Sequence, residues 1–205
     1  MCGRYYIADE EEIMEMREIL KEVNQRYADR PERERMKTGE IFPTDLVPIL
    51  AADQQDTRAS LMTWGYPRWQ GSGVVINARA ETAAIKPLFS PSLAGRRCIV
   101  PANGFYEWDH ATAGKKRKYL IRRPETPMLY MAGLYSAFKD PAGIYHTSFV
   151  ILTTAANAAI MAIHDRMPLI VGPDQKEQWL HDEQYARVLL ASPATPALQL
   201  MLAEV

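Results

Sequence analysis

The sequence contains few cysteines and no metal-binding pattern. Cys2 and Cys98 are the only cysteines, too few for a disulfide-stapled scaffold. Neither a paired CxxC motif nor an HExxH motif occurs, so we expect no zinc site, no other metal and no cofactor. We therefore interpret both cysteines as free thiols in the reducing cytoplasm.

Long apolar runs and a strong net charge are also missing. No run of 18 apolar residues occurs, and the N-terminus has neither the pattern of a signal peptide nor that of a membrane span. The formal net charge of −1 provides no global field that would attract nucleic acid, so any DNA contact must be local. The cationic run Lys115–Lys118 is more typical of a solvated hairpin tip. We expect a monomer without a membrane partner.

What is present is an ordinary globular composition. A chain of 205 residues can bury one sizeable core, and we see no linker or internal repeat, which favours a single domain over 1–205. Asp9 and Glu12 resemble a capping box, and Ile13, Met16 and Val23 recur at helical spacing, which predicts a helix over 10–25. Residues 26–44 lack periodicity and are expected to form an exposed loop.

Short apolar or alternating runs dominate the remainder of the chain. Turn residues bound the expected strands, which are Leu46–Ala51, Ser60–Trp64, Val74–Asn77, Cys98–Pro101, Gly104–Trp108, Tyr119–Arg122, Met128–Leu134 and Ser148–Thr153. Helices are expected over 155–163 and 176–180. Because strands and helices do not alternate, we predict an α+β fold with a curved or barrel-like, mostly antiparallel β-sheet and flanking helices.

Cys2 becomes chemically distinctive once Met1 is removed, as its small side chain permits. Its free α-amine and its thiol then lie on one residue and can close a five-membered ring around an aldehyde carbon. An α-amine with a pKa near 8 is partly neutral at physiological pH and can form a Schiff base that the thiol captures as a thiazolidine. Gly3 would allow a close backbone approach, and Arg4 could hold a phosphate. The alternative is a small residue at a frayed terminus.

An apolar strand ends in the polar segment 77–82. Asn77 offers a donor and an acceptor, and Arg79 can clamp a phosphate in a bidentate way. Alternatively, Asn77 caps a turn and Arg79 pairs with Glu81.

Glu107 lies between aromatic residues on an expected strand. Alternation places Phe105 and Glu107 on one face, where the ring would partly desolvate the carboxylate, raise its pKa and suit it to proton transfer. The alternative is an edge-strand glutamate that points into water.

His164 closes the helix expected over 155–163, and Pro168 follows it. The negative end of that helix would favour the protonated imidazole, which could act as a general acid. A simple helix C-cap is the alternative.

The segment Thr63–Trp69 combines three aromatic residues with an arginine. Bases stack on such platforms without a sequence code, which makes Trp64 and Trp69 candidates for DNA contact. Trp64 could equally be a core residue beside a turn.

These motifs together resemble the SRAP family, the SOS response-associated peptidase proteins. The resemblance rests on Met-Cys-Gly-Arg, Trp64-Gly65, Asn77–Thr82, Gly104–Trp108 and Ile163–Pro168, which occur in the family's order and spacing. It implies a β-rich fold in which Cys2 forms a thiazolidine with the ring-opened sugar of an abasic site in single-stranded DNA. It also implies that Asn77, Glu107 and His164 surround the crosslink, without any metal. The implied DNA contacts are Arg4, Pro43, Trp64, Trp69, Arg79 and Glu81.

The sequence departs from the family pattern in two places. An Asn-containing segment usually precedes the proline numbered Pro43 here, whereas this chain reads Glu40-Ile41-Phe42. Many members carry a further motif near the C-terminus, whereas this chain has the apolar stretch Leu198–Leu202, which we expect to pack as a helix.

Three functions remain open on the sequence. The leading hypothesis is covalent capture of abasic single-stranded DNA, which is Schiff-base chemistry of the lyase type. The second is a cysteine peptidase, or an autopeptidase that acts only on its own Met1 junction, with Cys2 as nucleophile and His164 as base. The third is non-covalent single-strand binding through Trp64, Trp69 and the arginines.

Overall fold

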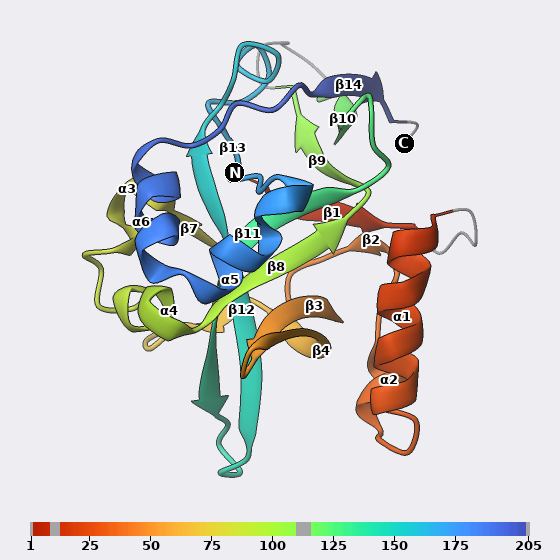
Figure 1. The fold of residues 1–205 in the computed structure, drawn as a ribbon, viewed down its shortest axis with the longest axis vertical. Coiled ribbons are helices and arrows are strands. Elements are labelled where there is room, and N and C mark those ends of the chain that lie inside the picture. The colour runs from red at the N-terminus through yellow and green to blue at the C-terminus, as the bar shows by residue number, and fades with distance from the viewer. Residues whose placement is uncertain (1, 9–12, 110–115, 204–205) are drawn as a thin grey trace.

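A computed structural model of the chain describes residues 2–8, 13–109 and 116–203 (Figure 1). It has an α+β fold in which two sheets form the centre and helices lie on the flanks, as predicted. Within the described residues, no helix is long and apolar enough to span a membrane.

The first sheet closes into a five-stranded barrel. Its strands are β3 (Leu46–Asp53), β4 (Asp56–Trp64), β8 (Arg97–Ala102), β11 (Leu129–Lys139) and β12 (Tyr145–Ala155). Antiparallel pairs join β4 to β3, β3 to β8, β8 to β11 and β11 to β12, and a parallel pair between β12 and β4 closes the ring. The barrel-like sheet expected from the short strands is therefore confirmed.

Burial explains why these runs form the barrel. Every residue of β8 is buried, and β12 is buried without a break from Ser148 to Thr154. A strand that is covered on both faces has a continuous apolar run rather than a strict alternation. Ile99, Phe149 and Ile151 are completely inaccessible and belong to this core.

The second sheet carries the N-terminus. Its strands run in the order β14 (Gln199–Leu202), β10 (Lys118–Arg122), β9 (Gly104–Trp108), β1 (Arg4–Ile7) and β2 (Gly39–Ile41). Two expectations were wrong here. Residues 199–202 form a strand rather than a helix, because they pair with the edge of β10, and β2 interrupts the loop expected over 26–44 by pairing with β1.

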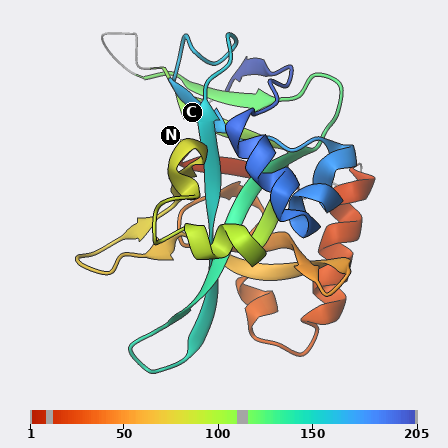
Figure 2. The same ribbon diagram turned by 60° about the vertical axis from the view of Figure 1, so that its left-hand side comes forward.

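Two short strands and a ribbon gather near the end of β12. The strand β7 (Asn77–Arg79) runs parallel to β12, and β13 (Arg166–Pro168) runs antiparallel to it. The ribbon of β5 (Tyr66–Pro67) and β6 (Val74–Val75) projects from the barrel next to them (Figure 2). The motifs around Asn77 and His164 therefore converge on one end of β12.

Helices cover two sides of the sheets. The predicted N-terminal helix is confirmed as α1 (Met14–Arg26), which buries Met16, Ile19 and Val23 and contacts β3 and β4. The expected capping box lies outside the described residues. The other helices are α2 (Glu32–Arg35), α3 (Ala80–Ala83), α4 (Ser90–Gly95), α5 (Lys176–His181) and α6 (Glu183–Ala191), with a 3₁₀ turn at Pro173–Gln175. Helices α3, α4 and α6 lie on the side opposite α1 (Figure 1), whereas α5 reaches α1 through the ion pair of Lys176 with Glu15 at 2.7 Å.

The helix expected over 155–163 was wrong. The strand β12 continues to Ala155, and the residues that follow form turns. The side chain of Asn157 accepts a hydrogen bond from the backbone N–H of Ile160 at 3.1 Å and donates one to the carbonyl of Pro196 at 3.0 Å. Such local side-chain bonds compete with helix formation.

Arg97 ties the helical layer to the barrel, which yields a stability prediction. Its buried guanidinium donates to the carbonyls of Leu93, Ala94, Trp179 and Leu180 at 2.6–2.9 Å, where α4 and α5 end. Arg97→Met would leave these carbonyls without their donors and should lower the free energy of unfolding by roughly 3–5 kcal/mol in urea denaturation. Arg187→Met, which breaks an exposed ion pair with Glu183, is the control. An equal decrease in the free energy of unfolding in both variants would contradict this role of Arg97.

Candidate active site

Cys2 lies buried two residues before β1, in contact with Asn77. The side-chain Nδ2 of Asn77 donates to the carbonyl oxygen of Cys2 at 2.9 Å, and Cys2 itself is completely inaccessible. The Oδ1 atom of the same Asn77 amide is buried and makes no hydrogen bond within the described residues. The alternative of a frayed terminus therefore does not hold, and neither does that of Asn77 as a turn cap.

The register of β1 and β9 brings Glu107 to the same place. Arg4 pairs with Tyr106, so continuing the antiparallel register by one residue sets Gly3 opposite Glu107, next to Cys2. Burial raises the pKa of the Cys2 thiol strongly, and the negative charge of Glu107 raises that pKa further. At neutral pH the sulfur is therefore a neutral thiol, which is consistent with its donation to the carbonyl of Arg4 at 3.5 Å.

Glu107 is desolvated, as the aromatic flanks predicted. It is only 3% exposed, because β9 lies between β1 and β10 and is not an edge strand. Burial raises the pKa of its carboxyl group from 4.5 to about 7, and the charge of Asp165 also raises it. A carboxyl group with this pKa can both give and take a proton near neutrality.

The raised pKa of Glu107 predicts a pH-dependent stability. Between its ordinary pKa of 4.5 and about 7, the unfolded chain loses this proton while the folded chain keeps it. Stability from this group is therefore complete below pH 4.5 and lost as the pH rises through 7. Between pH 5 and pH 8 the free energy of unfolding, measured by urea denaturation, should fall by roughly 2–3 kcal/mol more in the wild-type protein than in Glu107→Gln. If the free energies of unfolding of the two proteins changed equally with pH, this would contradict a buried, protonatable Glu107.

His164 lies in the turn before β13 rather than at a helix end, so the helix-end argument for its protonation was wrong. Its Nδ1 accepts a hydrogen bond from the backbone N–H of Arg166 at 2.9 Å. Asp165 Oδ1 also lies 3.0 Å from Nδ1, but the side chain of Asp165 is 80% exposed. The bond from Arg166 decides the assignment, because a backbone N–H can only donate. Assigned from this bond, the neutral imidazole carries its proton on Nε2.

Glu81 pairs with Arg166, a partner that the sequence pattern does not indicate. The carboxylate of Glu81 accepts two hydrogen bonds from Arg166, at 2.6 and 2.9 Å, and the guanidinium also donates to the carbonyl of Thr153 at 2.6 Å. The alternative pairing of Glu81 with Arg79 was therefore wrong. Both carboxylate oxygens of Glu81 accept from Arg166, so its place among the predicted DNA contacts is better explained by this ion pair. Glu81 fastens α3 to β13, beside His164.

Trp64 is part of the core, so the prediction that it stacks on DNA bases was wrong. Its side chain is completely buried, and its ring meets Tyr5 edge-on at 5.1 Å between centroids. Its Nε1–H donates to the carbonyl of Ile76 at 3.1 Å, the residue immediately before Asn77. Trp64 therefore helps to position Asn77.

Other candidate DNA contacts lie at the surface. Trp69 is 99% exposed at the tip of the β5–β6 ribbon, and Arg79 is exposed at the end of β7. Arg4 is partly exposed and pairs with Glu40 at 3.0 Å, and its guanidinium lies 4.2 Å from the ring centroid of Phe42. Pro43 follows Phe42 and is partly buried.

Comparison with known proteins agrees with this geometry. The family model "SOS response associated peptidase (SRAP)" matches residues 1–204. The chain belongs to the SRAP family.

Curated relatives of this SRAP protein carry a common description. The abasic site processing protein YoqW of Bacillus subtilis is 32% identical over 200 residues, which cover 93% of this chain and 86% of YoqW. The abasic site processing protein YedK of Escherichia coli is 32% identical over 163 residues, covering 78% of this chain and 72% of YedK. A crystal structure of a protein from Bacteroides thetaiotaomicron has the same fold, with a TM-score of 0.78 and 24% identity over 99% of this chain and 92% of that one.

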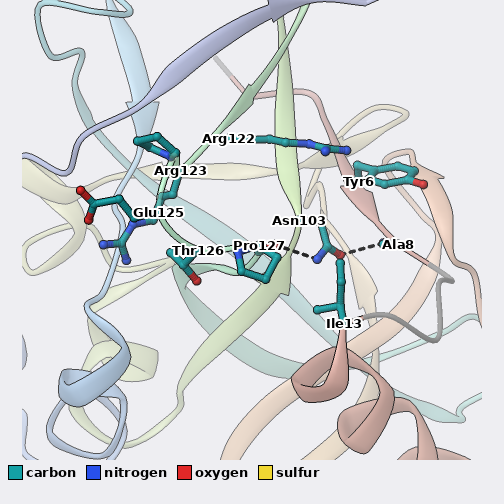
Figure 3. A pocket seen from close by; sticks show the side chains of 10 residues that line it. Tyr6, Ala8, Ile13, Asn103, Arg122, Arg123, Glu125, Thr126 and Pro127 are labelled. Atoms are coloured by element: carbon teal, nitrogen blue, oxygen red, sulfur yellow. Dashed lines mark hydrogen bonds between the residues drawn. The ribbon is translucent and has the colours of Figure 1, made fainter.

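Neither a group of metal ligands nor the cavity in Figure 3 adds a catalytic residue to this site within the described part of the SRAP chain. No three His, Cys, Asp or Glu side chains group as metal ligands in residues 2–8, 13–109 and 116–203. The cavity in Figure 3, between Tyr6 and the loop 122–127, is lined by none of the four predicted catalytic residues. There the buried Asn103 accepts from the N–H of Ala8 and donates to the carbonyl of Pro127, which is a structural link.

Proposed function

We propose that this protein captures abasic sites in single-stranded DNA by forming a thiazolidine between Cys2 and the ring-opened sugar. The observation that carries the proposal is the buried Cys2 held by Asn77 next to a protonatable Glu107. Two relatives are named as abasic site processing proteins, which supports the same substrate.

The reaction begins at the α-amine that removal of Met1 would expose. The amine adds to the aldehyde carbon of the sugar, and loss of one water gives a Schiff base. The sulfur of Cys2 then adds to the same carbon, its proton passes to the nitrogen, and a five-membered ring results. Aldehyde and cysteine thus give thiazolidine and water, without an oxidant or a metal.

The surrounding side chains have separate tasks in this scheme. Asn77 fixes the Cys2 carbonyl and keeps its Oδ1 available as an acceptor for the new amine. Glu107 takes up and returns protons during addition and loss of water, since its pKa lies near neutrality. The Nε2–H of His164 donates a hydrogen bond to the sugar oxygen. Trp69, Arg79, Arg4 and Pro43 guide the flanking strand.

The protonation state of Cys2 favours capture over peptide hydrolysis. A cysteine peptidase needs a thiolate, which a neighbouring cation stabilises by lowering the thiol pKa. Here burial and Glu107 raise that pKa. In capture the imine nitrogen of the same residue can take the thiol proton as the sulfur adds to the neighbouring carbon, so no separate cation is needed to form a thiolate.

The direct test uses a single-stranded oligonucleotide with one abasic site. We expect a heat-stable adduct on a denaturing gel, and none with an oligonucleotide whose lesion is a tetrahydrofuran that lacks the aldehyde. Equal adducts with both strands would contradict capture through the aldehyde. Binding to both strands without any heat-stable adduct would favour the non-covalent alternative.

A further inference from the structure

A second cavity lies on the side of the barrel next to the Asn77 segment. It has a volume of about 380 Å³, within the usual range for small-molecule sites. Its floor is the seam where Ser148 of β12 pairs with Thr63 of β4, and Val74 and Pro67 of the β5–β6 ribbon form one wall. The end of the β11–β12 hairpin forms the opposite wall.

The lining has two chemical zones. Phe138, Val74, Pro67 and Pro141 give it apolar walls, and Thr63 and Ser148 place hydroxyl groups at the floor. At the rim, Arg35 and Lys139 are exposed cations without an ion pair among the described residues. The one carboxylate, Asp140, is already paired with His146 at 2.9 Å. The rim is therefore positive above an apolar, hydroxyl-bearing pocket.

We propose that this cavity, the base cavity, binds one nucleotide of the strand that carries the lesion, with the base inside and its phosphate at Arg35 and Lys139. The proposal rests on the proposed function. An aromatic and apolar wall suits the face of any base, the two hydroxyls can bond to base edges, and free cations suit a phosphate.

The chain geometry supports continuity with the candidate active site. Val74 lines the base cavity, and Asn77, which holds Cys2, follows three residues later, so about 10 Å of extended chain separates them. The same ribbon carries the exposed Trp69 at its tip. Gly65, directly before β5, lets Val74 of β6 pack against the base of the ribbon, since its φ is +116° and a Cβ there would lie 2.7 Å from Val74 Cγ2.

A spacer scan tests this assignment without crosslinking. Each DNA strand would carry a tetrahydrofuran, which has neither base nor aldehyde, at the lesion position. A second tetrahydrofuran would replace one neighbouring nucleotide at a time, and the affinity of each strand would be measured by fluorescence anisotropy. We expect the wild-type protein to bind roughly 5- to 150-fold more weakly when one particular neighbour lacks its base. Phe138→Ala should lose this positional dependence.

The charged rim gives a second, independent readout. Lys139→Glu should weaken binding of every strand and reduce the salt dependence, whereas Arg17→Glu, the same change on an exposed face of α1, should leave binding close to wild type. The base cavity would be overturned if the wild-type affinity did not depend on the position of the second spacer, or if Phe138→Ala and Lys139→Glu bound the strands as the wild type does. Absence of a heat-stable adduct from an aldehyde-bearing strand, with the scan as expected, would instead overturn only the capture reaction.

Discussion

Cys2→Ala should form no heat-stable adduct with abasic single-stranded DNA. The variant still loses Met1 and keeps an α-amine, so it can form the Schiff base, but no sulfur is present to close the ring. Schiff bases hydrolyse on heating, whereas reduction with borohydride would trap them. We therefore expect Cys2→Ala to give a band only after borohydride treatment, on a denaturing gel that compares it with wild type.

Cys98→Ala is the matched control for this experiment. Cys98 is the other buried free thiol, and burial also raises its pKa, but it lies in β8 within the barrel. Its loss should leave adduct formation intact per folded molecule. A heat-stable adduct of Cys2→Ala, or loss of the adduct in folded Cys98→Ala, would show that sulfur at position 2 is not the capturing atom.

Glu107→Gln should slow adduct formation by about 10²- to 10⁴-fold at pH 7, the usual contribution of a general acid–base group. Glutamine keeps the shape of the side chain but cannot exchange a proton. The wild-type rate should also change with pH around 7, where burial places the pKa of this carboxyl group, and the variant should lack that inflection.

Glu125→Gln removes an exposed carboxylate and serves as the control, with the wild-type rate expected. Single-turnover kinetics at saturating DNA separate this effect from binding, because the amide should bind the strand as well as the acid does. A Glu107→Gln rate within a few-fold of wild type at every pH would remove Glu107 from the proton transfers.

The fold could be predicted where local pattern and burial agree. The strand Gly104–Trp108 is found with the expected bounds, and short runs such as 46–51 and 148–153 lie within longer strands. The helices expected over 155–163 and 198–202 failed for tertiary or local reasons. Asn157 bonds its own turn, and residues 199–202 complete the edge of a sheet that no local signal reveals.

The candidate residues could be picked out where the residue type alone is distinctive. An N-terminal cysteine and a carboxylate between aromatics marked Cys2 and Glu107, and the register of β1 and β9 brings both together. Side-chain partners were not predictable. Glu81 bonds Arg166 across 85 positions of the chain, and an aromatic motif does not reveal that Trp64 faces the core while Trp69 faces solvent.

Intact-mass measurement tests the central claim most directly, because it reports the state of the N-terminus and the bond in a single spectrum. After incubation with an abasic single-stranded oligonucleotide and denaturation, we expect the mass of the chain without Met1 plus that of the oligonucleotide minus one water. An unmodified chain, or an adduct on a chain that retains Met1, would contradict capture by the amine and thiol of Cys2.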